Sequence, residues 1–221
     1  MVKAFIFDLD GVITDTAALH FTAWSSLAKE INITIDHTFN TKLKGLSRID
    51  SLKTILKEHN RLHQYTAEEL EFLAEEKNKH YVQLIATLTP KHILPGILDL
   101  LRELKTNKYK IGLASSSQNA GAILERLELL HYFDIIANPT LIKSGKPAPD
   151  IFLLAASLLN VSPDLCIGIE DAESGIHSIK QAGMVAVGVG KKDQLPHADY
   201  VCSTTYELTL PRLLHVWTEK R

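Results

Sequence analysis

The sequence predicts an α/β fold with a Rossmann-like, three-layer α/β/α core, and three observations lead to this prediction. Short apolar runs rich in Ile, Val and Phe alternate with amphipathic helical stretches over most of the 221 residues. Helices between uninterrupted apolar strands indicate right-handed crossovers and a parallel sheet that is covered on both faces. The alternation stops over residues 15–90, where helical spacing continues without a convincing strand. We therefore expect a core domain, residues 1–14 and 91–221, with a small all-helical domain, residues 15–90, inserted after the first strand.

The core elements follow from apolar runs and helical spacing, taken in chain order. The expected strands are Ala4–Phe7, Lys110–Ala114, Ile135–Ala137, Leu165–Ile169, Met184–Val189 and Tyr200–Val201. The expected helices of the core are Ile97–Thr106, Ala120–Leu129, Pro149–Leu159 and Ser174–Ala182.

The inserted region shows helical spacing in two apolar series and one capping motif. The apolar series are Ala17, Phe21, Trp24, Ala28 and Ile31, and then Leu52, Ile55 and Leu56. Thr66-Ala67-Glu68-Glu69 is a capping box that opens a long helix towards Leu88. The stretch from Pro90 to Gly96 is interpreted as the linker back to the core.

Charge and composition exclude several classes of protein. Lys and Arg number 24 and Asp and Glu number 26, a net charge of −2 that argues against nucleic-acid or membrane partners. Two cysteines, Cys166 and Cys202, are too few for a disulfide framework. The chain reaches Asp8 without the apolar segment of a signal peptide, and no apolar run approaches the ~20 residues of a membrane span. We expect a cytoplasmic, monomeric protein.

Two expected strands run directly into acidic residues. In an open parallel sheet the binding crevice lies beyond the carboxyl ends of the strands. The first strand leads into Asp8-Leu9-Asp10-Gly11, whose two carboxylates can act as nucleophile and as acid or base, while the glycine permits a sharp turn. The strand before Glu170-Asp171 ends in a second carboxylate pair that could hold Mg²⁺ beside a phosphate. The alternative for the first pair is an exposed Asp-Gly turn, and the alternative for the second pair is that the acids cap the following helix.

Two further clusters follow strands with groups that suit a phosphate. Ser115-Ser116-Ser117-Gln118-Asn119 precedes a helix, whose first N–H groups are unpaired and can bind an anion. Lys146 lies between turn-forming residues of the segment Lys143–Asp150. The alternatives are ordinary N-capping by a serine and a solvated loop lysine.

These four motifs, in this order and each at a strand end, resemble those of the haloacid dehalogenase superfamily of phosphotransferases. The matching residues are Asp8-Leu9-Asp10-Gly11-Val12, Ser115, Lys146 and Glu170-Asp171. The resemblance covers essentially the whole chain, and the inserted helices resemble the superfamily's small α-helical cap domain.

The resemblance implies Mg²⁺-dependent phosphoryl transfer through an aspartyl-phosphate on Asp8. Asp10 would protonate the leaving oxygen and later deprotonate the incoming hydroxyl. Ser115 and Lys146 would bind phosphoryl oxygens. The implied metal ligands are Asp8, the backbone carbonyl of Asp10, Glu170 and Asp171.

A second candidate phosphate site lies in the insert, within Lys44–Ser51. Here a glycine, Ser47 and Arg48 stand at a predicted helix start. Arginine binds phosphate with a fork of N–H donors, and the helix N-terminus adds further donors. Such a site, remote from Asp8, fits a bisphosphate or a sugar phosphate that binds in two orientations. The alternative is a surface arginine at a helix cap.

Within the superfamily, the chain resembles the branch that interconverts β-glucose 1-phosphate and glucose 6-phosphate. This resemblance implies hexose phosphates as partners and glucose 1,6-bisphosphate as activator and intermediate, and it assigns Thr16 to the placement of Asp10. It assigns sugar-phosphate binding to His20, Trp24, Gly45, Leu46, Ser47, Arg48, Ser51, Lys77, Ser116, Ser117, Gln118 and Asn119. Gln118 departs from the pattern, since that branch often has lysine there.

Two other functions compete with this isomerase reading. A Mg²⁺-dependent sugar-phosphate or phosphoglycolate-type phosphatase would carry the same motifs, because they do not decide whether water or a sugar hydroxyl accepts the phosphoryl group. A non-catalytic sugar-phosphate sensor would keep the fold but should lose Asp8 or Asp10, and the sequence retains both.

Overall fold

The core of the molecule is a single parallel sheet. The computed structural model describes residues 1–43 and 46–220. Six strands pair in the order β3-β2-β1-β4-β5-β6, and every neighbouring pair is parallel. The strands are β1 (Ala4–Phe7), β2 (Lys110–Leu113), β3 (Ile135–Ile136), β4 (Cys166–Glu170), β5 (Val185–Val189) and β6 (Tyr200–Cys202). The sequence prediction is confirmed for all six, with ends that differ by at most one residue.

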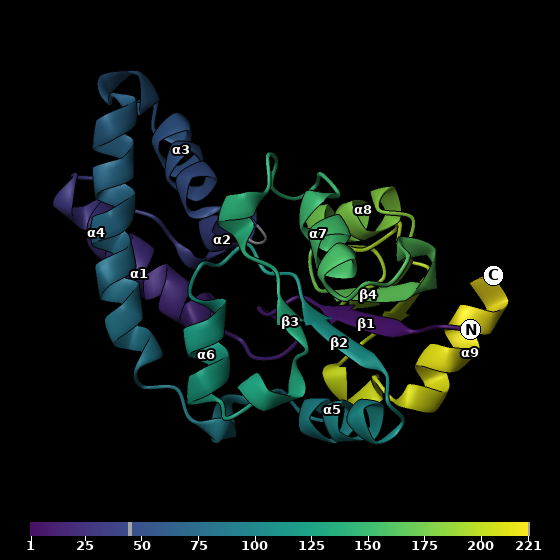
Figure 1. The fold of residues 1–221 in the computed structure, drawn as a ribbon. Helices are drawn as coiled ribbons and strands as arrows, with labels where there is room; N and C mark the ends of the chain where they lie inside the picture. Colours follow the sequence, from purple (N-terminus) through teal and green to yellow (C-terminus); the bar gives the residue numbers. More distant parts are fainter. Residues whose placement is uncertain (44–45, 221) are drawn as a thin grey trace.

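Helices cover the sheet on both faces, as the uninterrupted apolar strands predict (Figure 1). Alternate residues of β1 feed the two sides: Phe5 and Phe7 belong to one buried cluster, and Ala4 and Ile6 to the other. The first cluster is packed by α5 (Ile97–Thr106), α6 (Ala120–Arg126) and α9 (Leu210–Lys220). The second is packed by α7 (Asp150–Leu158) and α8 (Glu173–Gln181). The three-layer α/β/α core is therefore confirmed.

Helix α6 is shorter than the sequence predicts. The apolar spacing suggests a helix to Leu129, but the helix ends at Arg126. Glu128 adopts a left-handed conformation (φ 58°), and the Leu129 N–H donates to the Leu124 carbonyl at 2.8 Å. This is the hydrogen-bond pattern of a helix C-terminal cap, which ends the helix while Leu127 and Leu129 remain buried.

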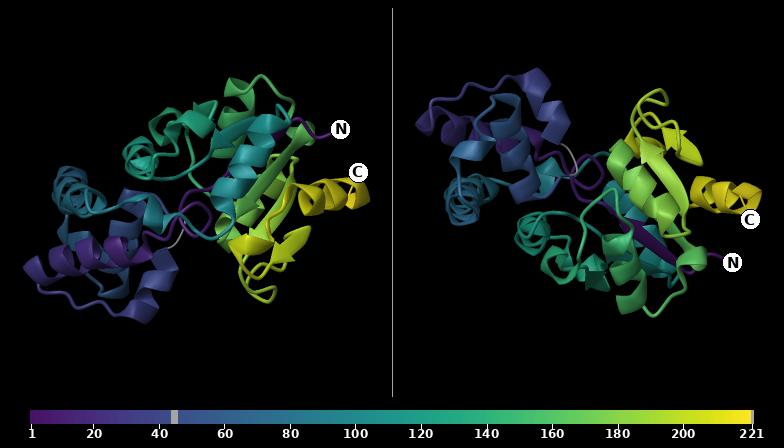
Figure 2. Two further views of the ribbon diagram at one scale, coloured as in Figure 1. Left: turned by 90° about the horizontal axis from the view of Figure 1, so that it is seen from below. Right: turned by 90° about the horizontal axis from the view of Figure 1, so that it is seen from above.

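Four helices follow β1 and form a separate body beside the sheet (Figure 2). They are α1 (Ala17–Glu30), α2 (His37–Asn40), α3 (Arg48–Glu58) and α4 (Ala67–Ile85). We call these residues the helical insert. It has its own buried cluster, which includes Trp24, Leu52 and Leu56. The predicted capping box is present: the Thr66 N–H donates to Glu69 Oε2 at 2.8 Å, and the Glu69 N–H donates to Thr66 Oγ1 at 3.2 Å.

Helix α4 connects the two bodies. Its residues Leu70 and Ala74 belong to the buried cluster of the insert, whereas Tyr81 and Ile85 belong to a cluster of the sheet. The intervening residues Lys77 and Asn78 line the cavity between the two bodies. Among the described residues, no helix combines the length and the apolar character that a membrane span requires.

Candidate active site

The carboxyl ends of β1, β2 and β4 bring together the residues that the sequence singles out. The strand order reverses direction between β1 and β4, and this switch point is where open α/β sheets bind ligands. Asp8 directly follows β1, and its N–H donates to the Ile169 carbonyl at 2.9 Å. Ser115 follows β2, and Glu170 is the last residue of β4. These strand ends form a polar site at the edge of an apolar sheet.

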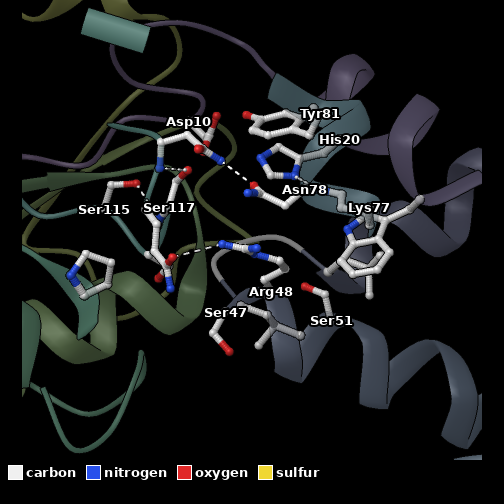
Figure 3. Close-up of a pocket in the computed structure, with 18 of the residues that line it drawn as sticks. Asp10, His20, Ser47, Arg48, Ser51, Lys77, Asn78, Tyr81, Ser115 and Ser117 are labelled. Carbon is white, nitrogen blue, oxygen red and sulfur yellow. Dashed lines mark hydrogen bonds between the residues drawn. The ribbon is translucent and has the colours of Figure 1, made fainter. Parts of the chain in front are cut away.

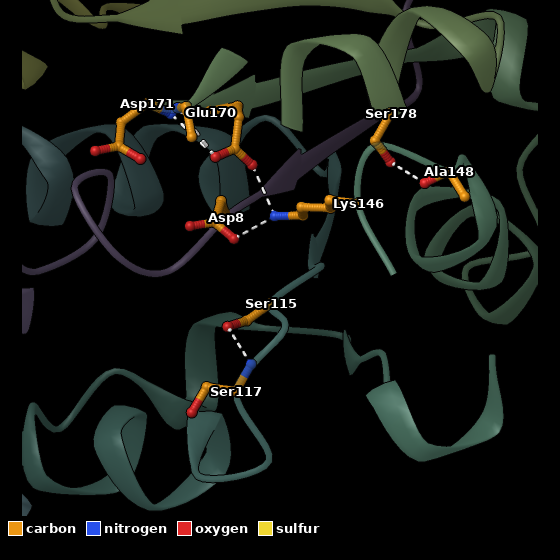
Figure 4. Close-up of polar contacts among 9 residues, drawn as sticks. Asp8, Ser115, Ser117, Lys146, Ala148, Glu170, Asp171 and Ser178 are labelled. Carbon is orange, nitrogen blue, oxygen red and sulfur yellow. Dashed lines mark hydrogen bonds and ion pairs between the residues drawn. The ribbon is translucent and has the colours of Figure 1, made fainter. Parts of the chain in front are cut away.

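Lys146 joins two of these carboxylates (Figure 4). Its Nζ lies 2.6 Å from Asp8 Oδ1 and 2.7 Å from Glu170 Oε2, and all three side chains are buried. Burial alone would lower the pKa of Lys146, but the carboxylates of Asp8 and Glu170 outweigh it and hold that pKa above its ordinary value. Burial and the charge of Asp8 raise the pKa of Glu170, against the opposing effect of Lys146. The predicted loop lysine is therefore a buried cation that holds the site together.

Backbone hydrogen bonds and close packing against Gly11 hold the acidic pair at the end of β4, Glu170 and Asp171, in position. Glu170 Oε1 accepts the N–H of Asp171 at 3.3 Å and that of Ala172 at 3.2 Å. Gly11 has a φ of +76°, and a Cβ placed there would lie 2.0 Å from Asp171 Oδ2. Only glycine suits this turn, because it accepts a left-handed φ and leaves room for the carboxylate.

The donor set suits a hard divalent cation. Carboxylate oxygens of Asp8, Glu170 and Asp171 lie within 4.8 Å of one another. Mg²⁺ prefers oxygen ligands from one or two carboxylates together with substrate phosphate and water. The residues present therefore fit the Mg²⁺ that the sequence motifs imply.

The loop after β2 presents hydroxyl and amide groups to the same space. Ser115 is buried, and its Oγ accepts the N–H of Ser117 at 3.1 Å (Figure 4). Ser117 Oγ in turn accepts the N–H of Asn119 at 3.2 Å. Asn119 reaches the insert, where its Nδ2 donates to Asn78 Oδ1 at 2.8 Å. The sequence leaves open whether these serines cap a helix or bind a phosphate. In the structure two serine oxygens accept backbone N–H groups within the loop, and Ser115 lines the same cavity as Asp8.

Asp10 connects the core to the insert through hydroxyl groups. Thr16 Oγ1 donates to Asp10 Oδ1, and the Tyr81 hydroxyl donates to Thr16 Oγ1 at 3.1 Å. Burial and the neighbouring Asp8 raise the pKa of Asp10 to about 7, although the bond from Thr16 opposes the shift. A carboxyl group with a pKa near 7 is suited to both giving and taking a proton at neutral pH.

Helices α1 and α4 place a second set of basic groups opposite Asp10 (Figure 3). Lys77 Nζ donates to His20 Nδ1 at 3.0 Å and lies over the rings of Trp24, at 4.7 Å, and Tyr81, at 4.3 Å. Burial and the charge of Arg48 lower the pKa of Lys77 to about 7. Burial and Lys77 lower the pKa of His20 well below its ordinary value. Among the described residues no carboxylate forms a hydrogen bond or ion pair with Lys77 or His20, so burial prevails and lowers both pKa values.

Arg48 extends from the start of α3 towards the core. Ser47 caps that helix by accepting the Asp50 N–H at 3.1 Å, which confirms the predicted helix start. The guanidinium lies 2.7 Å from Glu75 Oε2 and donates through Nη2 to Gln118 Oε1 at 3.0 Å. A lysine at position 118 could not accept that bond. Gln118 therefore allows Arg48 to approach the core without a like charge in front of it.

All these groups surround one cavity of about 470 Å³ between the sheet edge and the insert. Ser51 contributes to its wall from α3 and is buried. The sequence-predicted residues on its wall are Asp8, Asp10, His20, Trp24, Leu46, Ser47, Arg48, Ser51, Lys77, Ser115, Ser116, Ser117, Gln118, Asn119, Glu170 and Asp171. Thr16 and Lys146 contact it through Asp10 and Asp8. The predicted Gly45 lies outside the described residues.

Sequence reasoning missed three residues of α4: Glu75, which pairs with Arg48; Asn78, which pairs with Asn119; and Tyr81, which holds Thr16. With Glu71 they follow helical spacing, so they share one face of the helix. That series of polar residues, added to Lys77, was the signal available in the sequence.

The fold and the site define a class of protein, and comparisons place the chain in it. Residues 2–183 match the family model described as haloacid dehalogenase-like hydrolase. The chain belongs to this family, as its four motifs predict.

Individual relatives are more specific. The chain is 51% identical over 220 residues to a β-phosphoglucomutase of Bacillus subtilis, covering 100% of this chain and 97% of that protein. It is 32% identical to the fructose-1-phosphate phosphatase YqaB of Escherichia coli, over 83% of this chain and 94% of the relative. The crystal structure of a Clostridium difficile β-phosphoglucomutase superposes with a TM-score of 0.98 at 47% identity, covering 100% of this chain and 99% of that one.

Proposed function

We propose that this protein is a β-phosphoglucomutase that interconverts β-D-glucose 1-phosphate and glucose 6-phosphate through glucose 1,6-bisphosphate. One observation carries the proposal: a single cavity has a phosphoryl-transfer centre at Asp8 and, at its other end, a separate cation, Arg48, aimed inward from the insert. A phosphomutase needs two phosphate positions, because the bisphosphate binds in two orientations. Full-length similarity to two β-phosphoglucomutases supports the same reading.

Mg²⁺ would be held by Asp8, Glu170, Asp171 and the backbone carbonyl of Asp10. When bound, it supplies positive charge that offsets the repulsion between a carboxylate nucleophile and a phosphate dianion.

The chain's own residues divide the chemistry between nucleophile, cation and proton carrier. Asp8 attacks the phosphorus and becomes an aspartyl-phosphate while the sugar oxygen leaves. Lys146 and Ser115 bind phosphoryl oxygens and keep the phosphorus in line with the attacking oxygen. Asp10 gives its proton to the leaving sugar oxygen, and in the next half-reaction takes the proton of the sugar hydroxyl that attacks the aspartyl-phosphate. Thr16 holds the Asp10 carboxyl in place for both steps.

The insert, residues 15–90, acts as a cap that holds the sugar and its second phosphate. Arg48 binds the phosphate that is not at Asp8, which requires that phosphate to compete with Glu75 and Gln118 for the guanidinium. His20, Lys77 and Asn119 supply donors for sugar hydroxyls along the cavity wall. Trp24 and Tyr81 hold the Lys77 ammonium between their rings.

The core and the insert of one chain together line the cavity, so the proposed reaction requires no residue from a second chain. Cys166 and Cys202 are both buried and neither forms a disulfide, which suits a reducing cytoplasm.

A sugar-phosphate phosphatase is the second candidate, and the 32% identity to a fructose-1-phosphate phosphatase favours it. The phosphatase differs only in that water, rather than a sugar hydroxyl, takes the phosphoryl group from Asp8. Arg48 favours the mutase over a hydrolase of sugar monophosphates, since such a hydrolase has no need of a site for a second phosphate.

One incubation separates the two functions. The protein is mixed with β-glucose 1-phosphate, Mg²⁺ and a trace of glucose 1,6-bisphosphate, and glucose 6-phosphate and free phosphate are followed separately. The mutase reading expects glucose 6-phosphate in large excess over phosphate. Stoichiometric phosphate release would establish the phosphatase instead. α-Glucose 1-phosphate serves as the matched control and should give little product.

A further inference from the structure

A cluster of metal-binding side chains lies outside the cavity, at the surface where α8 meets the connection between β5 and β6. Glu173 and His177 come from α8, and His197 comes from the connection. One carboxylate oxygen and two imidazole nitrogens lie within 4.8 Å of one another. The catalytic mechanism uses none of these residues.

The helix and the connection hold the three side chains close to one another. Glu173 and His177 are four residues apart, so they lie on one face of α8. The connection is anchored on both sides of His197. Leu195 is buried before it, and the carboxylate of Asp199 after it accepts bonds from Lys180 Nζ and the Ala186 N–H, each at 2.8 Å. His197 is therefore presented to α8 by a fixed stretch of backbone.

The ligand atoms are available to an ion from solution. The two imidazole rings lie 4.5 Å apart at an interplanar angle of 45°, and His177 Nε2 is 3.8 Å from Glu173 Oε1. Within residues 1–43 and 46–220, no hydrogen bond holds either imidazole. Side-chain exposure is 39% for His177 and 58% for Glu173, so water and ions reach the cluster.

We propose that Glu173, His177 and His197 form a surface site for a divalent transition-metal ion of the zinc type. Imidazole nitrogen selects Zn²⁺, Cu²⁺ and Ni²⁺, whereas Mg²⁺ takes oxygen ligands such as the carboxylates of the active site. Three protein ligands leave at least one position to water. The ion joins α8 to the β5–β6 connection, and α8 begins two residues after Asp171. The site depends on none of the conclusions about the reaction.

The test uses untagged, chelator-treated protein kept in millimolar Mg²⁺, so that the active-site carboxylates are occupied. Zn²⁺ is titrated by calorimetry, and Cu²⁺ is added for electron paramagnetic resonance. The variants are His177→Ala and His197→Ala, with Glu173→Gln as the conservative change. His215→Ala is the matched control, because His215 forms the same four-residue pair with Glu219, at 3.3 Å, but has no second histidine.

The expected result is one Zn²⁺ per chain and a Cu²⁺ spectrum with nitrogen ligands. Each histidine variant should weaken Zn²⁺ binding at least tenfold, Glu173→Gln should weaken it less, and His215→Ala should change nothing. At a Zn²⁺ concentration 100 times the Kd, the wild-type Tm should rise by about 5–10 °C, and this rise should vanish in His197→Ala. Binding of Zn²⁺ that is equal in wild type and both histidine variants, or absent from wild type, would overturn the proposal.

Discussion

At the core end of the cavity the charged groups follow strands or strand-end loops and one buried lysine pairs with two carboxylates, whereas at the helical end they lie on helix faces among aromatic rings. Lys146 sits between Asp8 and Glu170, so its charge is retained. Lys77 lies between the rings of Trp24 and Tyr81, and burial together with the charge of Arg48 lowers its pKa to about 7. The two buried lysines thus differ in charge state because paired carboxylates offset the burial of Lys146, whereas no carboxylate among the described residues forms an ion pair with Lys77.

The two ends of the cavity therefore suit two different parts of the proposed reaction. The core end fixes a nucleophile and keeps its counter-charges permanently in place, as phosphoryl transfer requires. The helical end holds Lys77 and His20, whose pKa values are lowered by burial, together with Arg48, the proposed partner of the second phosphate. Substitutions at the core end should therefore remove chemistry, and substitutions at the helical end should alter binding and pH response.

The largest effect is expected from Asp8→Asn. The amide is nearly isosteric but is a poor nucleophile, so phosphoryl transfer should fall by at least about 10⁴-fold. The fold should persist, because Glu170 still pairs with Lys146. Phosphate incorporation from acetyl phosphate measures the step, with circular dichroism as the check on folding. Wild-type stoichiometry of phosphorylation in the variant would remove Asp8 from its role.

Asp10→Asn should have the next largest effect. Both half-reactions move a proton at the bridging oxygen, so formation and breakdown of the aspartyl-phosphate should each slow by ~10²–10⁴-fold. Rapid-quench measurement of the two half-reactions tests this. A variant within threefold of wild type in both would show that the proton travels by another route.

Arg48→Ala tests the helical end directly. Loss of a charge-assisted phosphate contact costs about 1.5–3 kcal/mol, so the mutase cycle should slow roughly 10- to 100-fold. Phosphorylation of Asp8 by acetyl phosphate should stay nearly unchanged, since that donor has no second phosphate. Lys53→Ala, an exposed change on the same helix, is the control. Equal losses in the mutase cycle and in phosphorylation by acetyl phosphate would place Arg48 at the first phosphate site and contradict a separate role for the helical end.

Lys77 should make stability depend on pH. Its pKa is about 7 in the folded protein and 10.5 in the unfolded chain, so between these values the unfolded state binds more protons. The free energy of unfolding should therefore rise with pH across this window, by at most about 1.4 kcal/mol per unit. Below pH 7 the lysine is charged in both states and no slope arises from it. Urea unfolding from pH 7 to 10 should show a slope that Lys77→Met lacks; parallel curves would contradict the assignment.

The core end of the cavity is the part of the site that the sequence predicts best. Asp8, Ser115 and Glu170 are adjacent in space because parallel strands end at one edge, and an apolar run followed by a polar residue is visible in sequence. The three-layer core and the helical region could be predicted for the same reason, since periodicity is a local signal.

The helical end was predicted less completely. Arg48 follows from its place at a predicted helix start, but Lys77 comes only from a family resemblance, and the contacts made by Glu75, Asn78 and Tyr81 were missed. Those contacts depend on how α4 packs against α1 and against the loop after β2, which is a tertiary property with no local signature. The length of α6 was overestimated for a similar reason, because burial of Leu129 continues an apolar pattern after the helix has ended.

Gly11 has a consequence for how this protein can vary. Its φ of +76° disfavours residues with a Cβ, and a Cβ built there would lie 2.0 Å from Asp171 Oδ2, so a substitution must displace the Asp171 carboxylate. Every missense change in its codon adds a Cβ and therefore disturbs a carboxylate of the proposed metal site. We expect a saturation library selected for activity to return mainly glycine at this position, while the exposed Lys53 of α3 tolerates many replacements. We therefore expect selection for activity to retain glycine at position 11.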